Sequence, residues 1–253
     1  MFSTETIKQL PTAEPRQTKD IGPCAPCSAC AIRHAARYSG IRDDEFSDLV
    51  ANSTNVTLHR SQTLFTEGDP AKQLYSIRRG TMMVYKMTPD GRRQITGFLS
   101  DGDILGLSSN GKYVRSAEAI TEVSLYRYPM RNLEDFLRRY PAVEQRICEI
   151  TRQELVETQE QMLLLGRKTA RERVASFLLK MDRHTNERGG GEGATSIPMT
   201  RQMIGDYLGI ATETVSRSLT EFDREGLISL VNAHQIQLVD IAELQNIANG
   251  RGE

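Results

Sequence analysis

Residues 200–222 read TRQMIGDYLGIATETVSRSLTEF, and they predict two short helices joined by a tight turn. Thr200 is one of the residue types that cap a helix N-terminus, because its hydroxyl can accept from a free backbone N–H. Ile204 and Leu208 follow it at helical spacing and give this helix one apolar face. Gly209 readily adopts the left-handed conformation that ends a helix, so we expect the turn there.

The second helix of this pair is expected to begin at a Thr212 cap and to bury a face built around Val215 and Leu219. Two short helices joined by a glycine-containing turn are typical of the helix-turn-helix, whose second helix enters the DNA major groove. Arg217 can hold a guanine through two hydrogen bonds, and Glu213 can accept one from cytosine N4. A helical hairpin with a merely polar outer face is the alternative. The candidate DNA-binding residues are Thr212, Glu213, Thr214, Ser216 and Arg217, with Ser218 expected beside them on the exposed side.

The sequence around this helix pair predicts a winged helix-turn-helix domain over residues 167–245. Residues 197–199 (Ile-Pro-Met) indicate a short strand, and residues 227–239 indicate a hairpin that turns near Asn232. The polar tail that starts at Asn246 is expected to fray.

Short β-rich runs separated by glycine indicate a different kind of domain over residues 41–131. Many short strands at intervals of about ten residues, with glycine turns between them, indicate a small antiparallel barrel or jelly roll. Asp90-Gly91 is the clearest hairpin signal, because a two-residue turn of this type needs positive φ at both positions. The runs that predict strands are residues 74–77, 82–85, 94–98 and 123–126.

A helical pattern begins at Asn132 and continues to about Gly166, which predicts a long helix over residues 132–166. Its apolar positions step by three and four residues, as the a and d positions of a coiled coil do. The stripe is narrow and half polar, which favours a seam between two helices over a face packed on the chain's own barrel. We therefore expect a homodimer, with the barrel-packed helix as the alternative. The expected interface residues are Thr151, Leu155, Thr158, Met162 and Leu165.

These motifs, in this order, resemble the CRP/FNR family of bacterial transcription regulators over about residues 40–245. The resemblance rests on residues 63–69 (TLFTEGD), residues 102–106 (GDILG), and residues 204–209 (IGDYLG) with the following Glu-x-x-Ser-Arg helix. Residues 94–98 (QITGF) and that helix are similar to the FNR and FixK branch. The resemblance implies an α+β chain with an N-terminal β-roll like a cyclic-nucleotide-binding jelly roll, a long dimerisation helix and a C-terminal winged helix-turn-helix.

The same resemblance implies a function. In the FNR and FixK branch, residues matching Glu213, Ser216 and Arg217 read a two-fold-symmetric site with TTGAT and ATCAA half-sites, as in TTGAT-N4-ATCAA. The chain would then be a transcription regulator, expected to activate, with double-stranded DNA and RNA polymerase as its partners. It would respond to oxygen or to redox state.

Three of the four cysteines lie close together in an arm over residues 1–40, which is expected to be flexible. Cys24, Cys27 and Cys30 follow one another at intervals of three. This spacing lets one loop wrap three sulfurs around an iron–sulfur cluster or a zinc ion. Thiol redox chemistry and inert cysteines are the alternatives.

The family resemblance extends to these cysteines in part. FNR holds a [4Fe–4S] cluster on N-terminal cysteines and one barrel cysteine, and Cys27 and Cys30 resemble its close pair. Its other two cysteines fall near Ala36 and Tyr126 here, so the chain departs from the pattern. Cys148 is the better candidate for a fourth ligand, because binding there would link the cluster to the dimer seam. The expected ligand set is Cys24, Cys27, Cys30 and Cys148, with His34 as the other candidate for the fourth position.

Two alternatives concern the signal. A FixK-like regulator without a cluster would be controlled by its abundance or by thiol oxidation. Residues 115–117 (Arg-Ser-Ala) resemble the phosphate loop of the cyclic-nucleotide branch, but residues 106–109 (Gly-Leu-Ser-Ser) lack its ribose-binding glutamate. Without that carboxylate a ribose hydroxyl loses its partner, so we expect no cyclic nucleotide.

Composition excludes several other classes of protein. The 253 residues include 32 Lys and Arg against 33 Asp and Glu, and 38% are hydrophobic, which is typical of a globular chain. No apolar run approaches the ~18 residues of a membrane span, and no signal peptide is evident, so we expect a cytoplasmic protein without a membrane partner. No catalytic triad, P-loop or Rossmann fingerprint is present, so we do not expect an enzyme. An iron–sulfur or zinc redox protein is the remaining alternative, and it would leave the recognition helix without a purpose.

Overall fold

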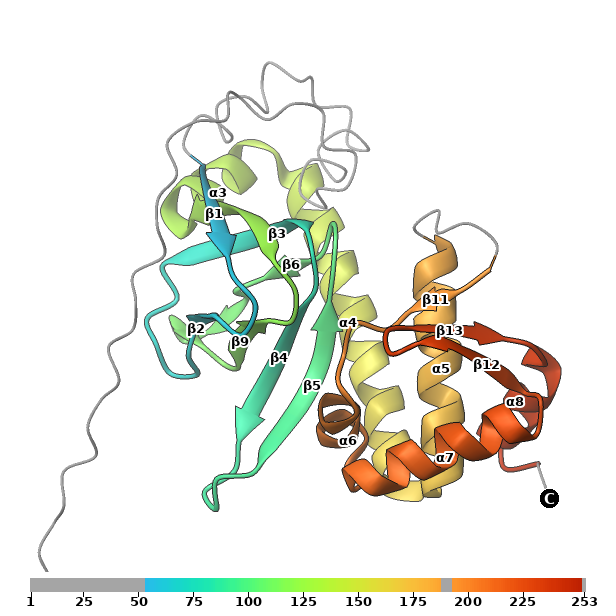
Figure 1. The fold of residues 1–253 in the computed structure, drawn as a ribbon. Coiled ribbons are helices and arrows are strands. Elements are labelled where there is room, and N and C mark those ends of the chain that lie inside the picture. The colour runs from blue at the N-terminus through green and yellow to red at the C-terminus, as the bar shows by residue number, and fades with distance from the viewer. Residues whose placement is uncertain (1–52, 188–192, 252–253) are drawn as a thin grey trace, which may run out of the picture.

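The computed structural model describes residues 53–187 and 193–251, and it confirms the expected β-roll (Figure 1). Two four-stranded antiparallel sheets contribute apolar side chains to one buried cluster between them. The first sheet has the order β1 (Thr54–Leu58), β10 (Val123–Pro129), β3 (Gln73–Arg79) and β6 (Ile104–Leu105). The second has the order β2 (Thr63–Phe65), β9 (Ser116–Ala119), β4 (Met82–Met87) and β5 (Arg93–Leu99), and a small pair joins β7 (Ser108–Ser109) to β8 (Lys112–Tyr113).

β4 and β5 form the expected hairpin, but its loop has three residues instead of two. The backbone N–H of Thr88 donates to the carbonyl of Arg92 at 2.8 Å, which leaves Pro89, Asp90 and Gly91 in the loop. Gly91 has a φ of 83°, whereas Asp90 does not take a positive φ. A type I turn followed by a left-handed residue has this pattern, and proline suits its first central position.

The helical segment after the β-roll is divided in two. α3 (Met130–Arg139) ends before Tyr140, and α4 (Pro141–Arg167) begins after it. Proline disfavours helical geometry in the residue before it, and Tyr140 accordingly has a φ of −127° and a ψ of 74°. The single helix expected over residues 132–166 was therefore wrong at this point, although α4 remains long.

The C-terminal part is a winged helix-turn-helix, as expected. α5 is followed by two short helices and a three-stranded sheet with the order β11, β13, β12. The strand expected over residues 197–199 is found two residues earlier, as β11. Pro198 falls outside β11, because proline has no N–H to donate to a neighbouring strand. The elements are α5 (Ala170–Glu187), β11 (Thr195–Ser196), α6 (Arg201–Leu208), α7 (Thr212–Arg224), β12 (Ile228–Asn232), β13 (Gln235–Leu238) and α8 (Ile241–Ala248).

The last helix, α8, was missed by the sequence analysis, which expected fraying from Asn246. The Asp240 carboxylate accepts from the backbone N–H of Glu243 at 2.9 Å and caps the helix. Leu244 and Ile247 are buried against the core. The spacing Asp-x-x-Glu before apolar residues was the available signal.

The β-roll and the C-terminal domain share one core. Met82 of β4 points into the roll, whereas its neighbour Met83 belongs to the cluster formed with α5, α6, α7 and α8. Ile95 of β5 joins the same cluster. Because side chains alternate along a strand, the second sheet serves both cores. Figure 1 shows α4 running between the two domains.

Candidate nucleic-acid interface

The first helix of the pair, α6, is fixed at both ends by local chemistry. The Thr200 hydroxyl oxygen accepts from the backbone N–H of Met203 at 3.2 Å, as the sequence predicted. Gly209 follows the helix with a φ of 63°. A Cβ on Gly205 would lie 2.7 Å from the Ile210 carbonyl oxygen, so the turn packs directly on the helix.

The second helix, α7, buries its apolar side and exposes its polar side. Val215 and Leu219 are at most 2% exposed, and they pack in the common core. Ala211 precedes the first helical residue and no side chain caps the helix, so the expected Thr212 cap was wrong. Thr212 is instead the first residue of α7, since the turn after Gly209 is only two residues long.

The outer face of α7 presents the groups expected to meet DNA. Glu213, Ser216 and Arg217 are exposed. Within the described residues, the side chains of Glu213 and Arg217 have no hydrogen bond or ion pair and are free to bind a base. The Ser216 hydroxyl donates to the Thr212 carbonyl at 3.0 Å and keeps its lone pairs available. Thr212 and Thr214 are half-buried.

Two positions on α7 differ from the sequence analysis. Ser218 was expected on the exposed side, but it is 5% exposed, because it lies three residues after Val215 and four before Phe222 and so shares their inner face. Thr220 is exposed one turn after Ser216, to whose carbonyl its hydroxyl donates at 3.0 Å. The spacing of four residues from Ser216 could have identified Thr220 as a further polar contact.

Comparisons with known proteins agree with both domains. A model of the Crp-like helix-turn-helix domain matches residues 172–247, and a model of the cyclic nucleotide-binding domain matches residues 55–140. The nitrogen fixation regulation protein FixK of Bradyrhizobium diazoefficiens is 36% identical over 222 residues, which cover 88% of this chain and 93% of FixK. The chain belongs to the CRP/FNR family.

Further relatives support the same branch of the CRP/FNR family. The transcriptional activator protein Anr of Pseudomonas aeruginosa is 34% identical over 255 residues, with 100% of both chains covered. The structure of FixK2 from Bradyrhizobium japonicum has a TM-score of 0.73 and 37% identity, and covers 77% of this chain and 96% of its own. This CRP/FNR protein is therefore a DNA-binding transcription regulator of the FNR/FixK type, and it is not an enzyme.

α4 carries an exposed apolar surface on the side away from its own β-roll. Leu155 is 59% exposed and Met162 is 70% exposed, and their spacing of seven residues, about two helical turns, places both on one face. Val156 and Leu163 are also exposed, although the steps of three and four residues did not predict them. We call these four residues the α4 stripe. Of the other expected interface residues, Thr151 and Thr158 are exposed, whereas Leu165 is half-buried against the common core.

The cysteines fit a metal cluster only in part. Cys24, Cys27 and Cys30, like His34 and the whole arm over residues 1–40, lie outside the described residues. Cys148 is an exposed free thiol on α4, seven residues before Leu155 and so on the face of the α4 stripe. Tyr126, near which the resemblance places the barrel cysteine, is 5% exposed in an apolar cluster. In the described residues, no group of three or more Cys, His, Asp or Glu side chains is placed to bind a metal ion.

The arginine that resembles a cyclic-nucleotide phosphate ligand is already paired. Arg115 Nη2 lies 2.5 Å from Glu154 Oε1 and joins the β-roll to α4. A Cβ on Gly106 would lie 2.8 Å from the Gln73 carbonyl oxygen, so this loop packs tightly on β3. A cyclic phosphate at Arg115 would have to displace the Glu154 carboxylate.

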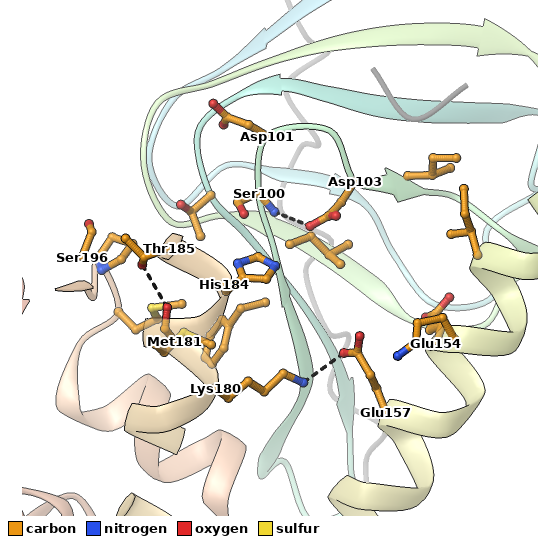
Figure 2. A pocket seen from close by; sticks show the side chains of 18 of the residues that line it. Ser100, Asp101, Asp103, Glu154, Glu157, Lys180, Met181, His184, Thr185 and Ser196 are labelled. Atoms are coloured by element: carbon orange, nitrogen blue, oxygen red, sulfur yellow. Dashed lines mark hydrogen bonds and ion pairs between the residues drawn. The ribbon is translucent and has the colours of Figure 1, made fainter. Parts of the chain in front are cut away.

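A cleft of about 1130 Å³ separates the β-roll, α4 and α5 (Figure 2). Asp101, Asp103 and His184 line it, and Lys180 Nζ of α5 pairs with Glu157 Oε2 of α4 at 3.0 Å. Burial alone would lower the pKa of Lys180, but Tyr207 and Glu157 together raise it, so the amine stays charged. The ion pair therefore connects α4 to α5 across the cleft.

No described helix is long and apolar enough to cross a bilayer.

Proposed function

We propose that this protein is a cytoplasmic homodimeric activator that binds a TTGAT-N4-ATCAA-like palindrome and acts through RNA polymerase. The single observation that carries the proposal is the outer face of α7, where Glu213, Ser216 and Arg217 are exposed together. We divide the chain into four functional parts: an arm over residues 1–40, a sensor domain over residues 41–131, a dimerisation segment over residues 132–166, and a DNA-binding domain over residues 167–245.

The proposed base contacts follow from the chemistry of these side chains. Arg217 donates two hydrogen bonds to N7 and O6 of the guanine in TTGAT. Glu213 accepts from N4 of a cytosine in the complementary strand. Ser216, Thr212 and Thr214 supply hydroxyl contacts to bases or phosphates, which fix the register of α7 in the groove.

The proposed dimer is formed by α4. Leu155 and Met162 are seven residues apart, as successive positions of a two-stranded coiled coil are. With Val156 and Leu163 they form an exposed apolar patch, and such patches mark sites of protein association. A second copy of α4 would cover the α4 stripe. The resulting two-fold axis matches the two-fold symmetry of a palindrome.

A gel mobility shift with labelled duplexes tests the proposed function. Wild-type protein is expected to bind the palindrome at least about a thousandfold more tightly than a duplex with both half-sites scrambled, at one fixed salt concentration. A duplex with a single half-site should bind more weakly than the palindrome, because only one α7 finds its sequence. Equal affinity for the palindromic and scrambled duplexes would overturn the proposal.

We also propose that Cys24, Cys27, Cys30 and Cys148 give the protein its response to oxygen or redox state. A [4Fe–4S] cluster on these thiolates would supply an oxygen-sensitive group. Cys148 would then anchor the arm to the start of α4, close to the proposed dimer seam. A chain without a cluster, controlled by abundance or by thiol oxidation, is the second candidate, and the buried Tyr126 at the barrel position favours it.

Purification without oxygen separates these two candidates. A cluster predicts about four irons per protomer and an absorption band near ~420 nm that disappears in air. Serine variants of the four cysteines should each lack the band, whereas a serine at an exposed threonine position outside the proposed set, Thr158→Ser, should keep it. Iron-free protein from iron-replete cells that binds the palindrome fully would exclude the cluster.

A further inference from the structure

The C-terminal end of α6 is held by side chains from other parts of the chain. The last carbonyls of a helix have no partner within the helix and must find one elsewhere. Here the Tyr207 carbonyl oxygen accepts from Gln94 Nε2 of β5 at 3.3 Å and from Gln161 Nε2 of α4 at 2.9 Å. The next carbonyl, that of Leu208, accepts from Arg173 Nη1 of α5 at 2.8 Å. Three different elements therefore meet at two consecutive residues of the helix-turn-helix.

The Tyr207 side chain joins the same elements. Its ring is 3% exposed and lies 5.1 Å from the Phe98 ring of β5 and 5.9 Å from the Phe177 ring of α5, between centroids. Its hydroxyl interacts electrostatically with the Lys180 amine, which in turn pairs with Glu157 of α4. Burial raises the pKa of this hydroxyl, so it stays protonated and can donate or accept.

The neighbouring residue, Asp206, adds a second link to the β-roll. Arg93 Nε of β5 lies 3.0 Å from Asp206 Oδ2, and the Arg93 guanidinium also approaches Glu118 of β9 at 3.8 Å. All three side chains are mostly buried, so these contacts are less screened than surface pairs. The β-roll thus contacts α6 on two consecutive residues.

The position of Tyr207 determines where the recognition helix lies. The backbone N–H of Ile210 donates to the Gly205 carbonyl at 3.2 Å, and the absent Cβ of Gly205 allows this close approach. The turn thus packs directly on α6, and we expect α6, the turn and α7 to move as one unit. In a dimer, the angle of this unit against α4 sets the separation of the two α7 helices, and hence the half-site spacing that both can read.

We propose that Gln94 and Gln161 are positioning residues for DNA binding. By donating to the Tyr207 carbonyl from the β-roll and from the dimerisation helix, they fix the orientation of α7 in each protomer and so select the four-base-pair spacer. Because each amide comes from a different element, displacement of either element shifts α7. This inference rests on the proposed dimer on a palindrome and adds the residues that define its spacing.

The test uses the full-length protein with Gln94→Met and Gln161→Met, singly and together, because methionine keeps the length of glutamine without its amide. Gln153→Met, on an exposed position of α4, is the matched control. Each protein is titrated on palindromes with four or five spacer base pairs and on one half-site. Each added base pair moves the half-sites by ~3.4 Å and rotates them by about 35°.

The double variant is expected to lose about five- to thirtyfold affinity for the four-base-pair palindrome, the scale of one or two hydrogen bonds. Its affinity for the half-site and for the five-base-pair palindrome should change less than about twofold, a pattern that general destabilisation does not produce. An unchanged spacer preference in a folded dimer would overturn the inference, as would an equal loss on all three duplexes.

A second measurement does not depend on DNA binding. It tests the inference if the wild-type protein does not bind the palindrome, or if the double variant is unstable. A spin label on an encoded non-cysteine residue at the exposed Gln237 of the wing reports the distance between the two DNA-binding domains. We expect a wider distance distribution in each single variant than in wild type and in the Gln153→Met control. Identical distributions would exclude the positioning role, whereas failure of the wild type on the palindrome alone would count only against the proposed function.

Discussion

Two helices of this molecule expose one face each, and the two faces have opposite chemistry. On α7 the outer face is polar, with Glu213 and Arg217 free of intramolecular partners among the described residues. On α4 it is apolar, with Leu155 and Met162 more than half exposed. An apolar face gains free energy by excluding water, whereas a polar face gains it through directed hydrogen bonds. We therefore expect the α4 stripe to bind a second copy of the chain and α7 to bind DNA.

The largest effect is expected from charge on the α4 stripe. Leu155→Glu combined with Met162→Glu would place like charges across the seam, so the protein should elute as a monomer. Binding to the palindrome should then fall at least about a hundredfold, because the two half-sites no longer share one protein. Size exclusion with light scattering and a mobility shift measure both results.

Gln153→Glu adds the same charge to another exposed position of α4 and serves as the control. It is expected to leave the dimer and the affinity unchanged. If the double variant still elutes as a dimer, the α4 stripe is not the dimer interface. The apolar face of α4 would then not bind a second copy of the chain, contrary to the contrast drawn with α7.

The second effect concerns Arg217 on the polar face. Arg217→Ala should remove a bidentate guanine contact and weaken cognate binding by about 1–3 kcal/mol, or five- to 150-fold, with little change on random DNA. Arg224→Ala, two turns further along the exposed side of α7, is the control, and any loss there should be equal on both DNAs. An equal loss on both DNAs for Arg217→Ala would mean that Arg217 binds only phosphate.

A smaller effect is expected from the cap of α6. Thr200→Ala leaves the backbone N–H of Met203 without its 3.2 Å partner and should cost about 1 kcal/mol of unfolding free energy. Thermal denaturation should show a fall of about 2–4 °C in midpoint. Thr200→Ser keeps the hydroxyl oxygen and should restore most of the loss. A fall of the same size in both variants would mean that the threonine methyl, and not the cap, is responsible.

Much of the fold follows from local sequence patterns. The apolar spacing of Ile204, Leu208, Val215 and Leu219 predicts the helix pair, and glycine-separated runs predict the β-roll. The errors are local as well: Pro141 ends one helix and begins another, and the cap at Asp240 starts a helix that the polar tail concealed.

The links between domains could not be predicted in this way. Gln94 and Tyr207 are 113 residues apart, and their contact depends on how two finished domains pack. No periodicity in either segment encodes that packing. The exposed Val156 and Leu163 were missed because each directly follows an expected seam residue, Leu155 or Met162, and so falls outside the steps of three and four residues. The base contacts and the cluster ligands remain predictions.

The smallest effect on affinity is expected at Cys148, which shares the face of the α4 stripe. In a parallel α4 dimer, residues at this position face each other across the axis, within the Cα separation that a disulfide allows. A variant with Cys24, Cys27 and Cys30 all changed to Ser keeps Cys148 as its sole thiol and binds no cluster, since a cluster needs about four ligands. Mild oxidation should convert it to a covalent dimer on a non-reducing gel, with palindrome affinity within about twofold of the reduced form. The same variant with Cys148→Ser added is the control and should not form the covalent dimer. If the variant that keeps Cys148 is dimeric in solution and still does not crosslink, Cys148 lies outside the seam.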